Sequence, residues 1–342
     1  MSEKVAEQAP LLQVSDLSIS FSTEEGSVTA VENLSFDVYP GQTLGIVGES
    51  GSGKSISVKA LMRLLPVNAS FGPNSKILYN LKKGGVTEIT SLSPQHKLLN
   101  RLRGGEIAMI FQEPSAAFSA LYTIGNQMIE GIRLHRQVSR QKARKIAADM
   151  LDRVGITNPE LRLEQYTFQL SGGMRQRVMI ASALAMQPAL LIADEPTTAL
   201  DVTIQAQILD LLAELQREFG MAIIFISHDL AVVSQVADTA LVMYLGKAME
   251  AGPVREVIRR PHHPYTQGLI QAIPKLEALD APLQPIPGDI PSPLERPTGC
   301  VFHTRCAVKR DHCMAKMPTT QSIARDHTAA CHLLTSESSF LP

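Results

Sequence analysis

The segment Gly48-Glu-Ser-Gly-Ser-Gly-Lys54-Ser55 constrains the fold of this chain more than any other. It matches the pattern G-x-x-x-x-G-K-[ST] and directly follows the continuous apolar run at residues 44–47. Glycines let the backbone curl so that its N–H groups point inward at an anion, and the helix that follows adds its positive end. A chance glycine-rich turn is the alternative. The pattern predicts a strand, a phosphate-binding loop and a helix, in which Lys54 reaches the phosphates and Ser55 reaches Mg²⁺.

Two further apolar runs, at residues 190–193 and 222–226, are also continuous rather than alternating. Such runs are typical of parallel strands that are buried on both faces. Between them, residues 205–219 place apolar side chains three and four positions apart, which indicates a helix. Strands that alternate with helices predict an α/β fold with a mainly parallel sheet.

The flanking regions follow different patterns. Residues 11–38 alternate apolar and polar side chains, which predicts antiparallel strands, and residues 115–185 have a mostly helical pattern. Prolines become frequent after about residue 260, which indicates a linker of extended or turn structure. We therefore expect one main domain at residues 1–258, with a helical subdomain at about 115–185, and a small C-terminal extension at 259–342.

Charge and hydropathy narrow the range of functions. The chain of 342 residues has 32 basic and 33 acidic side chains, a balance that gives no support for a nucleic-acid-binding surface. Residues 1–10 carry charges and no apolar run, so we expect no secretory signal. The most apolar windows are far shorter than the ~20 residues that span a bilayer. We expect that any role at a membrane depends on partners.

Two acids, Asp194 and Glu195, directly follow the apolar run at residues 190–193. Ligands bind at the carboxyl ends of the strands in open α/β sheets, so we expect both acids at a binding site. Asp194 stands where P-loop proteins place a Mg²⁺ ligand or its water network. Glu195 is a candidate general base that polarises the attacking water. Two surface carboxylates at a solvated strand end are the alternative, which the P-loop upstream disfavours.

The segment Leu170-Ser-Gly-Gly-Met-Arg-Gln-Arg177 resembles the signature of the ABC family of ATPases. Ser171, Gly172 and Gly173 would open a helix and present a hydroxyl and bare N–H groups to an anion. Taken alone, Ser-Gly-Gly is also an ordinary helix N-cap after a loop. The resemblance implies that these residues bind the γ-phosphate of an ATP molecule held by an opposite subunit, so that two ATPase domains must pair.

The other elements of the ABC pattern follow in order over residues 10–255. Gln112 resembles the Q-loop residue that contacts Mg²⁺, and Ala199-Leu-Asp201 resembles the D-loop at the dimer interface. His228 resembles the switch histidine near the γ-phosphate. Phe21 resembles the aromatic residue that stacks on adenine, although a Phe in an early strand can also be simply core.

The resemblance thus implies an α/β P-loop NTPase of ABC type with an antiparallel β subdomain, a helical subdomain and a C-terminal extension. Its catalytic residues would be Glu195 and His228. It implies these contacts with ATP: Phe21, Gly48, Ser50, Gly51, Gly53, Lys54, Ser55, Gln112, Ser171, Gly172, Gly173 and Asp201. The implied Mg²⁺ ligands are Ser55, Gln112 and Asp194.

The tail resembles the C-terminal extension of the ATPases of dipeptide and oligopeptide importers, in the segments Pro261-His-His-Pro-Tyr-Thr266, Pro285-Ile-Pro-Gly288 and Gly299-Cys300…Arg305-Cys306. This implies ATP-powered import of peptides or related small solutes. The implied partners are a related but different ATPase subunit, two membrane-spanning permease subunits and an extracytoplasmic binding protein, with the chain at the cytoplasmic face of the inner membrane. A soluble ABC ATPase of DNA repair or translation is the alternative, although such proteins usually carry two ATPase domains or a long coiled-coil insertion.

All cysteines of the chain lie after residue 299, at Cys300, Cys306, Cys313 and Cys331. Without an export signal, clustered cysteines indicate metal ligands more readily than disulfides. Four thiolates suit a [4Fe–4S] cluster or Zn²⁺, and the spacing is not the paired C-x2-C of a zinc ribbon. The resemblance implies the [4Fe–4S] cluster, with Zn²⁺ and metal-free thiols as alternatives.

Overall fold

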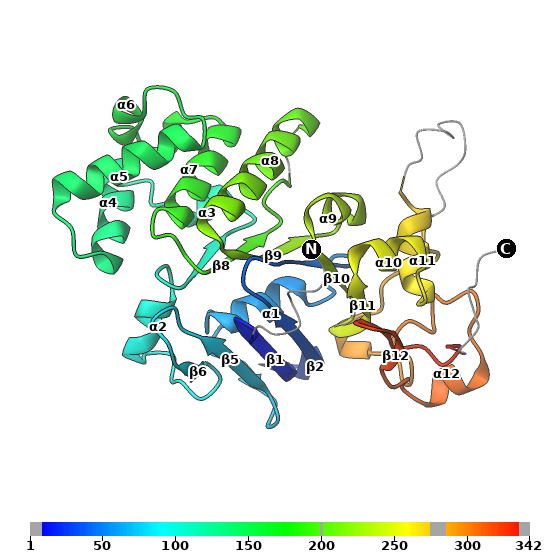
Figure 1. Ribbon diagram of the computed structural model, residues 1–342. Helices are drawn as coiled ribbons and strands as arrows, with labels where there is room; N and C mark the ends of the chain where they lie inside the picture. Colours follow the sequence, from blue (N-terminus) through cyan, green and yellow to red (C-terminus); the bar gives the residue numbers. More distant parts are fainter. Residues whose placement is uncertain (1–8, 199–200, 274–284, 335–342) are drawn as a thin grey trace.

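The computed structural model describes residues 9–198, 201–273 and 285–334, and it contains two β-sheets with helices packed around them (Figure 1). In this part of the chain the larger sheet has the order β12-β13-β11-β10-β3-β9-β8-β7. Neighbouring strands from β10 to β7 are parallel, and those from β10 to β12 are antiparallel. The strands are β3 (Thr43–Val47), β7 (Ile107–Ile110), β8 (Leu190–Asp194), β9 (Ala222–Ser227), β10 (Thr239–Tyr244), β11 (Lys247–Pro253), β12 (Gln321–Ala324) and β13 (His327–Ala329).

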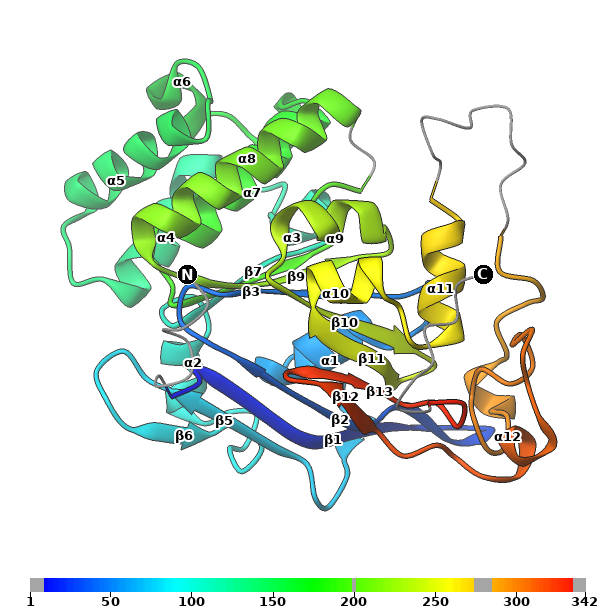
Figure 2. The same cartoon turned by 45° about the vertical axis from the view of Figure 1, so that its right-hand side comes forward.

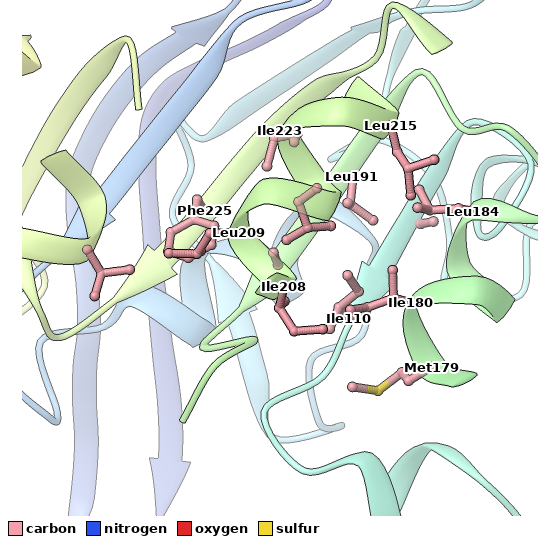
Figure 3. Packing of buried hydrophobic residues seen from close by; sticks show 14 of the residues in the cluster. Ile110, Met179, Ile180, Leu184, Leu191, Ile208, Leu209, Leu215, Ile223 and Phe225 are labelled. Atoms are coloured by element: carbon pink, nitrogen blue, oxygen red, sulfur yellow. The ribbon is translucent and has the colours of Figure 1, made fainter. Parts of the chain in front are cut away.

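The centre of this sheet consists of strands whose residues are all buried, namely β3, β8 and β9. These strands are the continuous apolar runs of the sequence, as predicted for strands covered on both faces. On one face, Ile208 and Leu209 of α8 (Val202–Phe219) pack with Ile180 of α7 (Gly172–Leu184) against Leu191 and Phe225 of the sheet (Figure 3). The predicted α/β fold class is confirmed.

The smaller sheet is antiparallel and has the order β2-β1-β5-β6, with β4 also paired to β1, within the described residues. Along β1, the side chains of Leu12, Val14, Leu17 and Ile19 are buried, and their apolar side chains join those of β3, β9 and the helix α1 in one core. The elements are β1 (Leu12–Thr23), β2 (Gly26–Val38), α1 (Lys54–Leu61), β4 (Ala69–Phe71), β5 (Lys76–Asn80) and β6 (Val86–Glu88).

Helices predominate between β7 and β8, as the sequence pattern predicts. They are α3 (Pro114–Ala117), α4 (Ile124–His135), α5 (Arg140–Arg153), α6 (Pro159–Leu163), the 3-10 turn η2 (Thr167–Gln169) and α7. The remaining helices are α2 (Lys97–Leu102), α9 (Leu230–Val236), α10 (Val254–Arg259), α11 (Pro264–Gln271) and α12 (Asp311–Ala315), with a 3-10 turn η4 (Pro293–Glu295). None of the helices in the described ranges is both long and apolar enough to cross a bilayer.

The C-terminal extension adds the strands β13 and β12 to the edge of the larger sheet. Its strand β13 pairs with β11, and β12 then pairs with β13 at the outer edge (Figure 2). The expectation of purely extended or turn structure after residue 260 was wrong for α11. Pro264 stands at the start of this helix, where its missing N–H is not needed and its fixed φ favours helix.

A buried hydrogen bond between two side chains fixes β13 to β11. The Nε2 atom of His327 lies 2.8 Å from Oε1 of Glu250, whose carboxylate also accepts the backbone N–H groups of His262 and His263 at 3.0 and 2.9 Å. Burial would raise the pKa of Glu250, but these hydrogen bonds outweigh burial and hold the pKa below its ordinary value of 4.5. The ionised carboxylate therefore stabilises the docked extension.

We expect Glu250→Ala to destabilise the fold by about 3 kcal/mol, because it leaves His327 and two N–H groups buried without their acceptor. Since the native pKa is depressed, the contribution of Glu250 is fully present above pH 4.5 and is lost as the pH falls through the native pKa. The difference in melting midpoint between wild type and variant, followed by circular dichroism, should shrink over that range. Glu256→Gln, at an exposed position of α10, is the control, and equal melting of both variants would contradict the assignment.

Candidate active site at the ends of the parallel strands

The predicted phosphate loop lies between β3 and α1, in the strand–loop–helix context that its pattern requires. Gly53 occupies the N-cap position of α1 with φ 93° and ψ 0°. A Cβ atom at this position would lie 2.7 Å from the carbonyl oxygen of Ala30. Both the left-handed backbone and the close approach of β2 therefore require glycine here.

Lys54 is 5% exposed, and its ammonium group is held by the loop itself. Its Nζ atom donates to the carbonyl oxygens of Gly48 and Glu49 at 2.6 and 3.0 Å. Burial lowers the pKa of Lys54, while the carboxylates of Glu195, Asp194 and Glu49 act in the opposite direction. The loop thus holds the ammonium group of Lys54 against its own carbonyl oxygens, where the charge can attract phosphate oxygens.

Ser55 and Asp194, two of the predicted Mg²⁺ ligands, meet directly. The Ser55 hydroxyl donates to Oδ1 of Asp194 at 2.8 Å, across 139 positions of sequence. Burial raises the pKa of Asp194, whereas the hydrogen bond from Ser55 lowers it. A hydroxyl and a carboxylate at one point are oxygen ligands of the kind that Mg²⁺ prefers.

The carboxylate of Glu195 is the centre of a second cluster. Its Oε2 atom accepts from Nε2 of Gln112 at 3.1 Å and from the hydroxyl of Thr198 at 2.9 Å, and it lies 3.4 Å from Nδ1 of His228. The backbone of Glu195 has φ 48°, a strained conformation for a residue with a side chain. The structure thus brings together three of the predicted site residues, Gln112, Glu195 and His228, and adds Thr198, which the sequence analysis missed.

The signature residues begin α7, where the Ser171 hydroxyl accepts the N–H of Met174 at 3.3 Å. Neither Gly172 nor Gly173 has a neighbour closer than 3.8 Å to the place of a Cβ atom. None of these residues lines the cavity beside the phosphate loop. Asp201 caps α8 by accepting the N–H of Ile204 at 2.9 Å, while Ala199 and Leu200 of the predicted D-loop lie outside the described residues.

An apolar cavity of about 240 Å³ adjoins the phosphate loop. Phe21, the predicted adenine-stacking residue, lines it together with Gly51 and Gly53 of the loop. Pro293 and Arg296 of the C-terminal extension also line it. A flat aromatic ligand attached to a phosphate chain fits a cavity with this composition and position.

The four cysteines line one small cavity of about 10 Å³, which is room for about one water molecule. Burial raises the pKa of Cys300 to about 11, and the three other thiols contribute in the same direction. Within the described residues, however, no group of three or more His, Cys, Asp or Glu side chains is arranged to hold a metal ion. The structure gathers the predicted ligands Cys300, Cys306, Cys313 and Cys331 but does not support the predicted metal site.

Models of two protein families match the chain. The ABC transporter family matches residues 31–198, and the oligopeptide/dipeptide transporter C-terminal region matches residues 249–313. Two proteins of Brucella melitensis whose names describe a peptide import ATP-binding protein are 43% and 46% identical to the chain. The first alignment covers 94% of this chain and 96% of the relative, and the second covers 91% of each.

Solved structures support the same fold. The chain resembles the ATP-binding cassette MJ0796 in a dimeric structure bound to ADP and Pi, with a TM-score of 0.62 and 24% identity over 71% of this chain and 99% of that one. It also resembles CbiO1 of Clostridium perfringens, part of the ABC transporter complex CbiONQ, with a TM-score of 0.60 and 27% identity over 73% and 91%.

These folds and sites define an ATP-hydrolysing cassette with a phosphate loop, two adjacent acids and a signature helix. The chain belongs to the ABC transporter family, with the C-terminal region of oligopeptide/dipeptide transporters. It is an ATPase that powers transport, and the comparisons support this interpretation rather than the alternative in DNA repair or translation.

Thr198→Val tests the cluster around Glu195, because it keeps the shape of the side chain and removes the hydroxyl that donates to the carboxylate. We expect kcat for ATP to fall about fivefold with KM nearly unchanged, since one such hydrogen bond contributes roughly 1 kcal/mol. Steady-state phosphate release by the assembled transporter that contains the variant chain is the measurement. Thr203→Val, at an exposed position of α8, is the matched control, and equal kcat values for both variants would refute a role of Thr198.

Proposed function

We propose that this chain powers the import of di- or oligopeptides through an ABC transporter. The observation that carries the proposal is the match of residues 249–313 to the oligopeptide/dipeptide transporter C-terminal region, on a chain with a complete set of nucleotide-site motifs. The names of the Brucella melitensis relatives, which align over almost the whole chain, support the same substrate class.

In this proposal the triphosphate of ATP lies on the phosphate loop, with Lys54 and the loop N–H groups against its oxygens. The adenine occupies the apolar cavity against Phe21. Ser55, Asp194 and Gln112 are the residues that would hold Mg²⁺, and the ion when bound neutralises charge on the β- and γ-phosphates. Ser50 and Gly51, both exposed in the loop, are available for contacts with phosphate.

Glu195 acts as the general base in the proposed mechanism. It accepts a proton from the water that attacks the γ-phosphorus, as the bond from phosphorus to the bridging oxygen breaks and ADP leaves. Gln112 and Thr198 fix the position of the carboxylate by hydrogen bonds to its Oε2 atom, and Nδ1 of His228 lies 3.4 Å from the same atom. We also assign His228 to the γ-phosphate, as its resemblance to the switch histidine implies.

A second ATPase domain completes the site. Ser171, Gly172 and Gly173 lie at the start of α7 and do not line the cavity beside the loop of their own chain. We therefore assign them, with Asp201, to the ATP molecule held by a partner ATPase, which we take to be a related but different chain. The N-terminus of α7 supplies the positive end that favours a γ-phosphate.

Exposed apolar residues between α3 and α4 and in η2 suit a partner embedded in the membrane. Leu121 and Tyr122 are 81% and 59% exposed between α3 and α4, and Phe168 in η2 is 67% exposed. The bridge between Thr123 and Tyr166 brings the two segments together. Large exposed apolar side chains in one region are typical of protein–protein interfaces. We assign this surface to two permease subunits, at the cytoplasmic face of the inner membrane, with an extracytoplasmic binding protein delivering the substrate.

We further propose that the four cysteines bind a soft metal centre, a [4Fe–4S] cluster in first place and Zn²⁺ as the alternative. The support is the gathering of all four thiols around one cavity, and the softness of thiolate ligands. Because burial raises the pKa of Cys300 to about 11, its thiol is protonated at neutral pH, and binding of a metal would release that proton.

Glu195→Gln separates binding from hydrolysis. We expect the Kd for Mg·ATP to change less than about twofold and kcat to fall by ~100-fold or more, because general-base catalysis is lost. In cells that lack the wild-type copy, the variant should fail to restore uptake of a labelled dipeptide. Glu214→Gln, exposed on α8, is the control for both measurements.

Two outcomes would refute parts of this proposal. Wild-type turnover by Glu195→Gln would remove Glu195 from the role of general base. Dipeptide uptake that does not depend on the wild-type chain, with loss of the uptake of another small solute in its place, would refute the peptide class while leaving the transport ATPase intact.

For the metal, the measurement is iron, sulfide and zinc content with a visible spectrum, on the chain purified without oxygen. About four irons per chain and a broad band near about 400 nm, both lost in Cys306→Ser, are expected for the cluster. About one zinc and no colour would establish the alternative. Neither metal in the wild-type chain would refute the metal centre.

A further inference from the structure

Glu49, the second residue of the phosphate loop, is held by a residue of the C-terminal extension. The Nη1 and Nη2 atoms of Arg305 donate to its Oε2 and Oε1 atoms at 2.6 and 3.1 Å, across 256 positions of sequence. The side chains of Arg305 and Glu49 are 4% and 26% exposed. Bidentate pairs of this kind combine strength with a fixed geometry, because the guanidinium is planar and rigid.

The guanidinium is itself fixed by the backbone of the extension. Its Nε atom donates to the carbonyl oxygen of Pro287 at 3.0 Å, and Nη2 donates to that of Ile286 at 3.2 Å. Arg305 also stands next to Cys306, in the segment that begins at Cys300, whose N–H donates to the carbonyl oxygen of Cys313 at 2.8 Å. These hydrogen bonds therefore hold the guanidinium of Arg305 in the orientation in which it reaches the phosphate loop.

A second contact reaches the same residue from another segment of the extension. The backbone N–H of Glu49 donates to the hydroxyl oxygen of Tyr265 at 2.9 Å. Tyr265, in α11, is fully buried, and its ring lies 4.8 Å from that of Tyr244 and 5.2 Å from that of Phe302. Both the side chain and the backbone of Glu49 are thus fixed from outside the nucleotide-binding domain.

These contacts bear directly on Lys54. The Nζ atom of Lys54 donates to the carbonyl oxygen of Glu49 at 3.0 Å. The orientation of the peptide group of Glu49 therefore influences the position of the ammonium group. Resting on the proposed function above, we propose that Arg305 is a positioning residue for ATP, which holds the phosphate loop in its binding conformation through Glu49. The extension is then part of the nucleotide site and not only a module attached to it.

A purely structural role of the pair predicts a different result. If Arg305 only docked the extension, its loss would lower the melting temperature and leave the folded protein with normal affinity for phosphates. Mg·tripolyphosphate distinguishes the two, because it occupies the phosphate loop without a base or ribose. Its binding therefore reports on the phosphate loop and not on the adenine cavity.

The experiment is titration calorimetry of Mg·tripolyphosphate and Mg·ATP with the full chain and with Arg305→Met, well below each melting temperature. We expect both Kd values to rise about tenfold, as part of the energy of a charged hydrogen-bonded pair is lost. In the assembled transporter, KM for ATP should rise similarly while kcat stays nearly constant. Arg305→Lys, which keeps the charge but loses the fork, should give an intermediate Kd.

Glu250→Gln is the matched control. Glu250 joins the extension to β11 through Nε2 of His327 at 2.8 Å, and neither residue lines the cavity beside the phosphate loop. This variant should melt at a lower temperature and bind Mg·tripolyphosphate as the wild type does. Glu49→Gln is the second test variant, should Arg305→Met fail to fold, and it should raise the Kd for Mg·tripolyphosphate to a similar degree. The double variant should be no weaker than either single variant, because both changes break the same contact.

Wild-type affinity for Mg·tripolyphosphate in Arg305→Met, or in Glu49→Gln where the first does not fold, overturns the inference. Additive effects of the two changes overturn it as well. These results differ from a failure of the proposed function, in which the wild-type chain itself would bind neither Mg·ATP nor Mg·tripolyphosphate.

Discussion

The site depends on the parallel register of the buried strands. Across β3 and β9, Val47 pairs with Ser227, and across β8 and β9, Asp194 pairs with Ile226. These strands therefore end in one row, and the residues that follow each end are delivered to the same edge of the sheet. The phosphate loop, Glu195 and His228 come from three such ends. A shift of any strand by one residue would move its side chains to the opposite face and separate these groups.

Burial of the strands also sets the electrostatics of this edge. Lys54 and Asp194 are only 5% and 3% exposed, so their charges act through a medium that screens them weakly. The loop carbonyls and Ser55 hold the two groups in place by hydrogen bonds of 2.6 and 2.8 Å. Because both side chains are held in this way, the site meets its ligand with little further reorganisation, which is the usual origin of electrostatic catalysis.

Local sequence patterns predict the strands and the phosphate loop of the site. They do not predict contacts between residues that are far apart in the sequence. The strands and the phosphate loop follow from apolar runs and a glycine pattern, which are properties of neighbouring residues. The contact of Arg305 with Glu49 joins residues 256 positions apart, and no periodicity of either segment contains that information. Thr198 was missed because a single threonine carries no pattern. For the cysteines the sequence predicted more than the structure shows. Spacing and resemblance predicted a metal site, whereas the structure shows only that the thiols gather around one cavity.

The geometry of the contacts between the extension and the ATPase domain indicates the role of the extension better than the energy of these contacts does. Its contacts with the ATPase domain include the buried hydrogen-bonded pair of Glu250 with His327 and the ion pair of Glu49 with Arg305. Replacing such pairs by apolar side chains of similar volume is often neutral or stabilising, so docking alone does not require them. What an apolar contact lacks is direction. A bidentate guanidinium fixes the orientation of a carboxylate, whereas packed methyl groups allow it to turn. Because the oriented residue lies in the phosphate loop, the geometry that this pair imposes is transmitted to the carbonyl that holds Lys54.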